Sequence, residues 1–167
     1  LSDRRQRQMC IRDSCLSDNQ LNIVEKNLGI PNTFIWSPDN SKFYFADTTD
    51  GSLIEYNFKL DDGSLSDKKV FFDFERGLPD GSTIDSEGYI WNCRWGGSCV
   101  VRIDPNGNID QIYELPVENV TNCVFGGSDL KTLYITTAFN EGKHQYDGSL
   151  FALNLTIPGL EDNKFKI

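Results

Sequence analysis

Two short segments of the chain place an oxygen-bearing side chain directly after a proline, at matching points of a repeating pattern. Asn32 follows Pro31, and Asp80 follows Pro79 in a Pro-Asp-Gly sequence that lies 48 positions further on. Each proline fixes one backbone angle and so stiffens the loop that we expect here. An amide oxygen and a carboxylate suit a hard cation such as Ca²⁺, Mg²⁺ or Mn²⁺. Asn32 and Asp80 are therefore the candidate metal ligands.

A third segment continues the pattern. Asn122 lies 42 positions after Asp80, in the sequence Thr-Asn-Cys. Three successive units thus offer Asn, Asp and Asn at one level. Pro-Asn and Pro-Asp-Gly are also ordinary turn sequences, so a purely structural role remains the alternative. His144, the single histidine, lies in a polar stretch with no Ser or Cys arranged beside it as a nucleophile, so we expect no catalytic role for it.

The elements that must position these side chains form a repeat. Residues 37–58, 83–107 and 125–155 each contain a turn rich in Asp, Gly or Pro, an aromatic strand, a polar turn and a second strand. The strand centres Tyr44 and Ile90 are 46 positions apart. With short extra strands between the units, the pattern predicts about four strands per unit of roughly 45 residues, which is a propeller blade. A β-sandwich also has short strands, but it lacks this long period.

The predicted fold is therefore an all-β propeller segment of about three blades. Matching positions on successive blades lie next to one another around a propeller channel, so the candidate side chains should converge near the axis. Propellers close with about four to eight blades. Three blades cannot ring a channel, so we expect this chain to be part of a larger propeller or to assemble with a second copy; its oligomeric state stays open.

Composition excludes several classes of function. The formal net charge is −9, whereas binding to nucleic acid or to an anionic membrane needs a basic surface. We find no apolar run near the roughly 18 residues of a spanning helix. The five cysteines have irregular spacing and form no CxxC pair, which is typical of reduced thiols in a cytoplasmic protein.

The N-terminal residues read differently from the rest. The stretch 1–14, LSDRRQRQMCIRDS, has no apolar period and resembles a translated sequencing adapter. We interpret it as an adapter-derived scar that packs against nothing, the alternative being a natural basic arm. Residues 15–28 are then a strand or linker left from a truncated blade, and residues 29–167 form the propeller domain.

Four ordered motifs from residue 29 onward resemble the gluconolactonase/regucalcin (senescence marker protein) family, in its C-terminal half. They read PNTFIWSPDNSKFYFADT, GLPDGSTIDSEGYIW, WGGSCVVRIDPNG and TNCVFGGSDLKTLYITTA. The resemblance implies a six-bladed propeller with one divalent cation, for which Ca²⁺, Zn²⁺, Mn²⁺ and Mg²⁺ are candidates. The implied ligands are a Glu of the first blade, the Asn of a Pro-Asn-Gly motif and the Asp of Pro-Asp-Gly; the last two correspond to Asn32 and Asp80.

The implied activity is hydrolysis of a sugar lactone, with Asp80 as both ligand and general base. Asn122 and Thr33 are weaker candidates for contact with substrate or for support of the ligands. Thr33 stands where the family motif has Gly. The half of the family pattern that carries the Glu ligand lies outside this sequence, so we expect the 167-residue chain to be inactive by itself. The alternative function is a non-catalytic propeller that binds a ligand or a partner.

Overall fold

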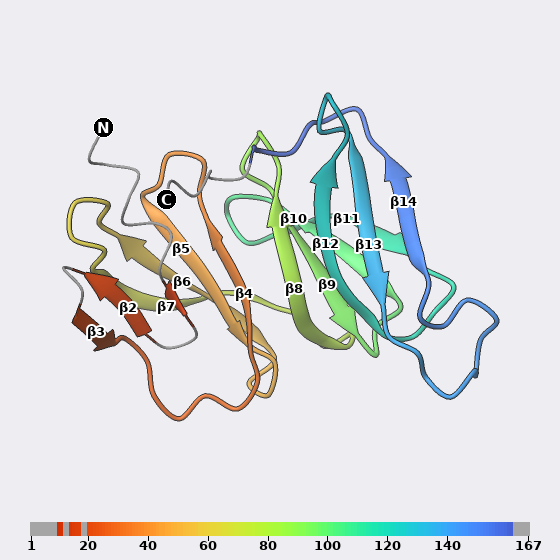
Figure 1. Ribbon diagram of the computed structural model, residues 1–167, viewed down its shortest axis with the longest axis horizontal. Coiled ribbons are helices and arrows are strands. Elements are labelled where there is room, and N and C mark those ends of the chain that lie inside the picture. Colours follow the sequence, from red (N-terminus) through yellow and green to blue (C-terminus); the bar gives the residue numbers. More distant parts are fainter. Residues whose placement is uncertain (1–9, 12–13, 18–19, 162–167) are drawn as a thin grey trace.

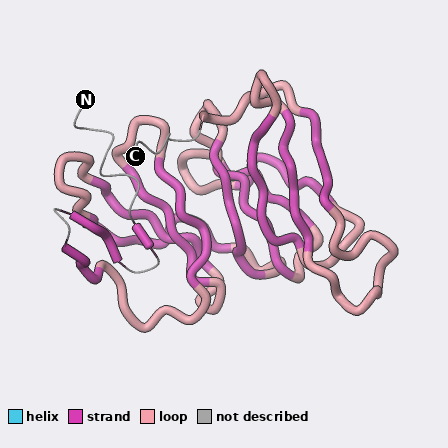
Figure 2. Tube along the Cα trace, viewed as in Figure 1, coloured by secondary structure: helices cyan, strands magenta, loops and turns pink. Residues whose placement is uncertain are grey.

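The computed structural model of the chain describes the backbone of residues 10–11, 14–17 and 20–161, and side chains from Ile23 onward. This described part consists of strands and loops and contains no helix (Figures 1 and 2). Consequently, it offers no helix long and apolar enough to cross a membrane.

Three antiparallel sheets follow one another along the chain, and we call them the first, second and third blades. The first blade contains β4 (Pro31–Trp36), β5 (Lys42–Asp47), β6 (Ser52–Phe58) and β7 (Leu65–Asp73). The second contains β8 (Leu78–Ile84), β9 (Ile90–Trp95), β10 (Cys99–Ile103) and β11 (Ile109–Glu114). The third contains β12 (Val120–Gly126), β13 (Thr132–Thr137) and β14 (Leu150–Asn154).

The blades stand side by side through their first strands. In each blade, the strands pair in sequence order, so every connection within a blade is a hairpin. Strand β8 packs beside β4 on one side and beside β12 on the other (Figure 1). This arrangement confirms the predicted all-β propeller segment of about three blades, with β4, β8 and β12 as the inner strands.

A small sheet precedes the blades. It contains β1 (Cys10–Ile11), β2 (Ser14–Ser17) and β3 (Gln20–Ile23). The described part of the predicted adapter segment, Cys10–Ile11 and Ser14, thus takes part in strand pairing. The remaining residues of that segment, 1–9 and 12–13, lie outside the described residues, and the domain boundaries stay predictions.

Two apolar cores lie between the blades because side chains of a strand point alternately to its two faces. In β5, Tyr44 and Ala46 enter the core shared with the second blade, whereas Phe43 and Phe45 enter a cluster on the opposite face. The second core contains Trp91 and lies between the second and third blades. Burial on both faces explains why the strands read as nearly continuous hydrophobic runs.

A buried ion pair connects β10 of the second blade with the turn that follows β8. Arg102 donates through Nη2 to Asp85 Oδ2 at 2.7 Å, and the Asp85 side chain is fully buried. The Arg102 guanidinium also lies 3.7 Å from the centroid of the Tyr89 ring. The same Asp85 oxygen also accepts hydrogen bonds from Arg102 Nε and from Trp91 Nε1, each at 2.9 Å. The carboxylate is thus paired and hydrogen-bonded, as burial of a charge requires.

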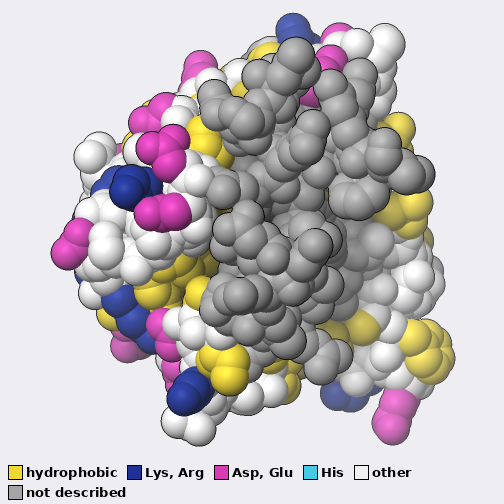
Figure 3. All heavy atoms as spheres, turned by 60° about the vertical axis from the view of Figure 1, so that its left-hand side comes forward, with side chains coloured by type: hydrophobic (Ala, Val, Ile, Leu, Met, Phe, Trp, Pro, Cys, Tyr) yellow, Lys and Arg dark blue, Asp and Glu magenta, His cyan; other side chains and the backbone are white. Residues whose placement is uncertain are grey.

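Charged side chains of both signs mix on the surface. On the face drawn in Figure 3, acidic and basic side chains are interspersed along the left side of the view. Three thiols with described side chains, Cys93, Cys99 and Cys123, are buried and unpaired. This agrees with the expectation of reduced, buried thiols for that part of the chain.

Candidate functional site

A bulge interrupts each inner strand at the level of the candidate side chains. The pairing register shifts between Asn32 and Phe34 in β4, between Pro79 and Ser82 in β8, and between Val120 and Asn122 in β12. A bulge adds an unpaired residue and re-aims the side chains beside it. The Pro-Asn and Pro-Asp segments are therefore bulged strands, and the expectation that they form loops was wrong.

The Asn32 amide has a defined orientation. Its Nδ2 donates to Thr48 Oγ1 at 2.8 Å, and that hydroxyl donates to the carbonyl of Pro79 at 2.7 Å. A hydroxyl has only one proton, so Thr48 must accept from Asn32. This fixes the amide with its nitrogen toward Thr48, and Oδ1 remains available on the other side.

Thr33 links the same two blades one residue further on. Its Oγ1 donates to the carbonyl of Asp80 at 2.7 Å and lies 2.8 Å from Ser82 Oγ. The residue is buried, and its φ is 54°, which is unusual for a β-branched side chain. The weaker prediction that Thr33 supports the ligands now has a concrete geometry, which is a hydrogen bond to the backbone of Asp80.

Asp80 is half-buried, and burial raises the pKa of its carboxyl to about 6, against a smaller lowering effect from the N–H of Gly81. In the described part of the chain, no side chain donates a hydrogen bond to this carboxylate. A carboxyl with a pKa near neutrality is suited to general base catalysis. Its charge is not neutralised by a side-chain donor among the described residues.

Asn122 lies against the residue that follows Asp80. A methyl group built on Gly81 would come within 2.1 Å of Asn122 Oδ1. The absence of a side chain at Gly81 thus makes room for Asn122. Asn122 Oδ1 accepts a hydrogen bond from the N–H of Cys123 at 2.8 Å, which fits a supporting place better than a ligand.

A buried polar network backs the site. Arg94, which is fully buried, donates to Asn92 Oδ1 at 3.0 Å, and Asn92 Nδ2 donates to Ser82 Oγ at 2.9 Å. Thr33 donates its one proton to Asp80, so Ser82 donates to Thr33. The donor direction therefore runs from a guanidinium to the Asp80 carbonyl.

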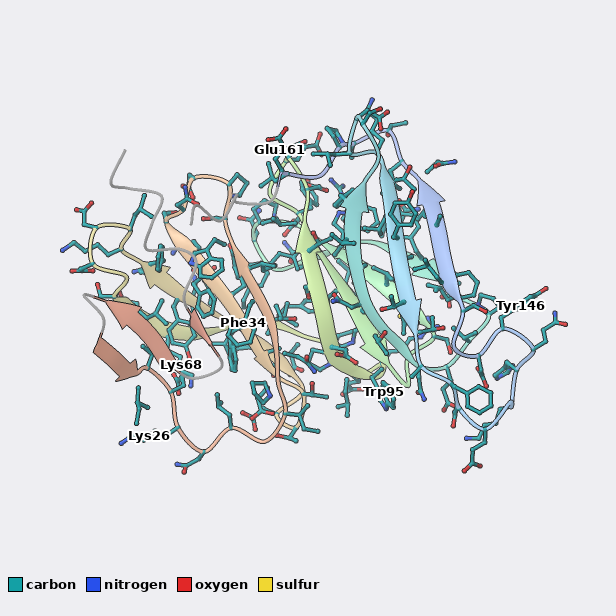
Figure 4. All side chains as sticks on the ribbon, in the orientation of Figure 1. Lys26, Phe34, Lys68, Trp95, Tyr146 and Glu161 are labelled. Atoms are coloured by element: carbon teal, nitrogen blue, oxygen red, sulfur yellow. The ribbon has the colours of Figure 1, made fainter. Side chains whose placement is uncertain are left out.

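These side chains occupy one end of the inner strands. Asn32 and Asp80 lie near the starts of β4 and β8. Trp95 pairs with Leu78 at the start of β8, and the sticks of Figure 4 show it at this end of the second blade. The candidate residues therefore lie near the turns that precede the inner strands, and not near the turns where these strands end.

The donor set fits a hard cation in part. The structure provides a carboxylate without a side-chain partner and an amide oxygen freed by Thr48, on neighbouring strands. Within residues whose side chains are described, no three His, Cys, Asp or Glu groups cluster as a metal site. Asn32 and Asp80 therefore stay candidate ligands, and a complete set would need further oxygen donors.

Sequence reasoning missed Thr48, Ser82, Asn92 and Arg94. Thr48 is 16 positions from Asn32, and nothing in the spacing shows that a hairpin brings it back to that residue. Its only signal is its place at the end of the first quoted motif. Arg94 is missed for another reason: a buried arginine held by carbonyl groups has no charged partner to suggest it in the sequence.

Comparison with known proteins identifies relatives of this chain. The model of the SMP-30/Gluconolactonase/LRE-like region matches residues 13–139. Pentonolactonase XacC of Haloferax volcanii is 39% identical over 135 residues, which are 80% of this chain and 45% of that protein. Regucalcin of Danio rerio is 37% identical over 113 residues, covering 66% of this chain and 38% of that protein.

Solved structures share the architecture. The calcium-binding protein regucalcin from Agrobacterium tumefaciens superposes with a TM-score of 0.84 at 29% identity, covering 92% of this chain and 55% of that one. The chain spans about half the length of the curated relatives it matches. The matched model, the relatives and the shared fold agree: the chain belongs to the SMP-30/gluconolactonase/LRE-like family of β-propellers.

Proposed function

We propose that the full-length protein, meaning this chain extended to the length of its relatives, hydrolyses a sugar lactone with the help of one divalent cation. The observation that carries this proposal is that a half-buried Asp80 carboxylate and an oriented Asn32 amide lie on neighbouring inner strands. The name of the Haloferax volcanii relative, a pentonolactonase, supports a lactone as the substrate class.

The residues of this chain would have distinct roles in binding the cation and in supporting its ligands. Asn32 Oδ1 and the Asp80 carboxylate hold the cation, which is Ca²⁺, Zn²⁺, Mn²⁺ or Mg²⁺. A bound divalent cation supplies positive charge that polarises the lactone carbonyl and stabilises the negative charge developing on its oxygen. Asn122 and Thr33 stand beside Asp80 and keep its strand in place.

Asp80 also has the chemistry of the general base. It accepts a proton from the water that attacks the carbonyl carbon. The ring C–O bond then breaks, and a proton passes to the departing alkoxide, which gives the open hydroxy acid. Burial raises the pKa of Asp80 in the cation-free chain, and a bound cation would lower it, so the carboxylate would be deprotonated and able to accept the proton.

A non-catalytic, cation-binding propeller is the second candidate. It is favoured by the description of the Agrobacterium tumefaciens structure as that of a calcium-binding protein. The two functions differ in turnover, because both need a cation but only one consumes a lactone. A cytoplasmic location and a small-molecule partner are part of our proposal in either case.

The test is an acid-release assay on the full-length protein with δ-gluconolactone and a pentonolactone. We expect turnover that a chelator abolishes and that one of the four cations restores. Cation binding without turnover of any lactone would support the binding function and reject the enzyme. We further expect the 167-residue chain alone to show no turnover, because two protein ligands leave a cation held mainly by water.

A further inference from the structure

Two threonines of the first blade donate to successive carbonyl groups of β8. Thr48 Oγ1 donates to Pro79 O, and Thr33 Oγ1 donates to Asp80 O, each at 2.7 Å. Both threonines are buried, at 7% and 4% exposure. Hydrogen bonds in a buried setting are held in place more strongly than exposed ones, because water does not compete for them. We call Thr33 and Thr48 the hydroxyl clamp.

The clamp determines more than the distance between two strands. Thr48 uses its proton on Pro79, so it orients the Asn32 amide by accepting from Nδ2. Thr33 uses its proton on Asp80, so it accepts from Ser82. One clamp residue thus acts on the orientation of Asn32, and the other acts on the backbone of Asp80.

Thr33 keeps its place at a conformational cost. Its φ of 54° lies in the left-handed region, where a β-branched residue is an outlier. Such strain persists only where the surrounding structure enforces it, and it gathers at functional sites. Glycine would adopt this φ freely but would bring no hydroxyl. Thr33 thus adds a hydroxyl that the glycine of the family motif lacks, and it uses this hydroxyl on Asp80 and Ser82.

We infer that the hydroxyl clamp positions Asn32 and Asp80 so that their oxygen atoms share one divalent cation. This inference rests on the proposed function. Thr33 and Thr48 are positioning residues, because they touch the ligand residues and their backbone and need not touch the cation. Partners that orient metal ligands in this way typically change metal affinity by about 10- to 100-fold when they are removed.

A manganese titration of the 167-residue chain tests the inference. Line broadening by Mn²⁺ in NMR spectra reports weak binding, and the Asn32 side-chain amide is the signal to follow. We expect Thr48→Val to weaken Mn²⁺ binding by about 10- to 100-fold and Thr48→Ser to restore most of it. Thr132→Val is the matched control, because its hydroxyl pairs with Asn154 in the third blade and should leave binding unchanged.

Thr33→Gly separates positioning from stability. Glycine relieves the strained φ and removes the hydroxyl, so we expect little change in melting temperature together with a loss of Mn²⁺ affinity of about 10-fold or more. A purely structural role predicts that affinity changes only as far as stability does. The Thr33 variants also keep the inference testable if Thr48→Val fails to fold.

A metal-free measurement distinguishes the two ways of failing. The clamp predicts slow hydrogen exchange at Asn32 Nδ2 in the unmodified chain and fast exchange in Thr48→Val. Slow exchange without any Mn²⁺ binding would overturn the inference that the clamped residues share a cation, whereas the function of the full-length protein would still be decided by its acid-release assay. Mn²⁺ binding that is equal in the unmodified chain, Thr48→Val and Thr33→Gly would overturn the clamp and leave the proposed function standing.

Discussion

Gly81→Ala should force the second and third inner strands apart. The added methyl carbon would lie 2.1 Å from Asn122 Oδ1, 2.4 Å from Cγ and 2.8 Å from Cβ. Rotation of the Asn122 side chain removes the first two contacts but not the third, because Cβ is fixed to the backbone. Carbon atoms pack at about 3.5–4.0 Å, so β8 and β12 must move apart by several tenths of an ångström.

Overpacking of this kind costs typically 1–3 kcal/mol. A loss of about 2 kcal/mol should lower the melting temperature of a chain of this size by roughly 4–8 °C. Thermal unfolding followed by circular dichroism is the assay. Asn122→Gly removes all three crowded atoms, so the double variant should be more stable than the sum of the two single changes allows.

Gly126→Ala is the matched control. Its new methyl group would meet only ring atoms of Tyr134, at 2.9 and 3.2 Å, and that side chain is partly exposed and free to swing. We expect it to cost much less than Gly81→Ala. Equal melting temperatures for Gly81→Ala and the unmodified chain, or strictly additive effects in the double variant, would refute the contact between Gly81 and Asn122.

Three further predictions concern stability. Burial acts to raise the pKa of the Asp47 carboxyl, but hydrogen bonds from the N–H groups of Ile30, Gly29 and Thr49 and from the Thr49 hydroxyl hold it at about 2. A lowered pKa gives stability that is present above the unfolded pKa near 3.9 and is lost as pH falls toward 2. The unmodified chain should therefore be more stable than Asp47→Asn by about 2 kcal/mol above that window, and this difference should vanish across it. Urea titrations at several pH values measure the difference. Arg102→Met leaves Asp85 buried without its ion pair and should cost about 3–5 kcal/mol, whereas Lys59→Met, in the exposed pair with Asp62, should cost less than about 1 kcal/mol; similar losses for both would contradict this. Removal of residues 1–14 takes away β1 and the first residue of β2, which pair within the small sheet, so the melting temperature of the blades should be unchanged or higher; a marked drop would show that this segment belongs to the native fold.

Much of the fold could be predicted from the sequence because the blade repeat is long and its strands are buried on both faces. The 46-position spacing of Tyr44 and Ile90, read from the sequence alone, favours a propeller over a sandwich. The inner strands were harder to identify. Pro31 and Pro79 read as loop residues, yet both begin or enter strands, because an inner strand with a bulge tolerates a residue that cannot donate to the ladder.

The candidate ligands could be named from spacing and resemblance, but their support could not. The sequence contains a threonine at position 48 and an asparagine at position 32, and only the β4–β5 hairpin shows that they meet. Likewise, Gly81 reads as an ordinary turn glycine until β12 is seen to bring Asn122 against it. Contacts across neighbouring blades depend on how the sheets pack, which a pattern within one strand does not encode.

The most direct test of the account is the effect of Asp80→Asn in the full-length protein. The substitution keeps the size of the side chain and removes both the charge that holds a cation and the base that accepts a proton. An acid-release assay with a lactone should show loss of cation-dependent turnover by at least about 100-fold. Asp61→Asn, in the exposed turn after β6, should retain full activity. Turnover that is unchanged by Asp80→Asn would contradict the central claim.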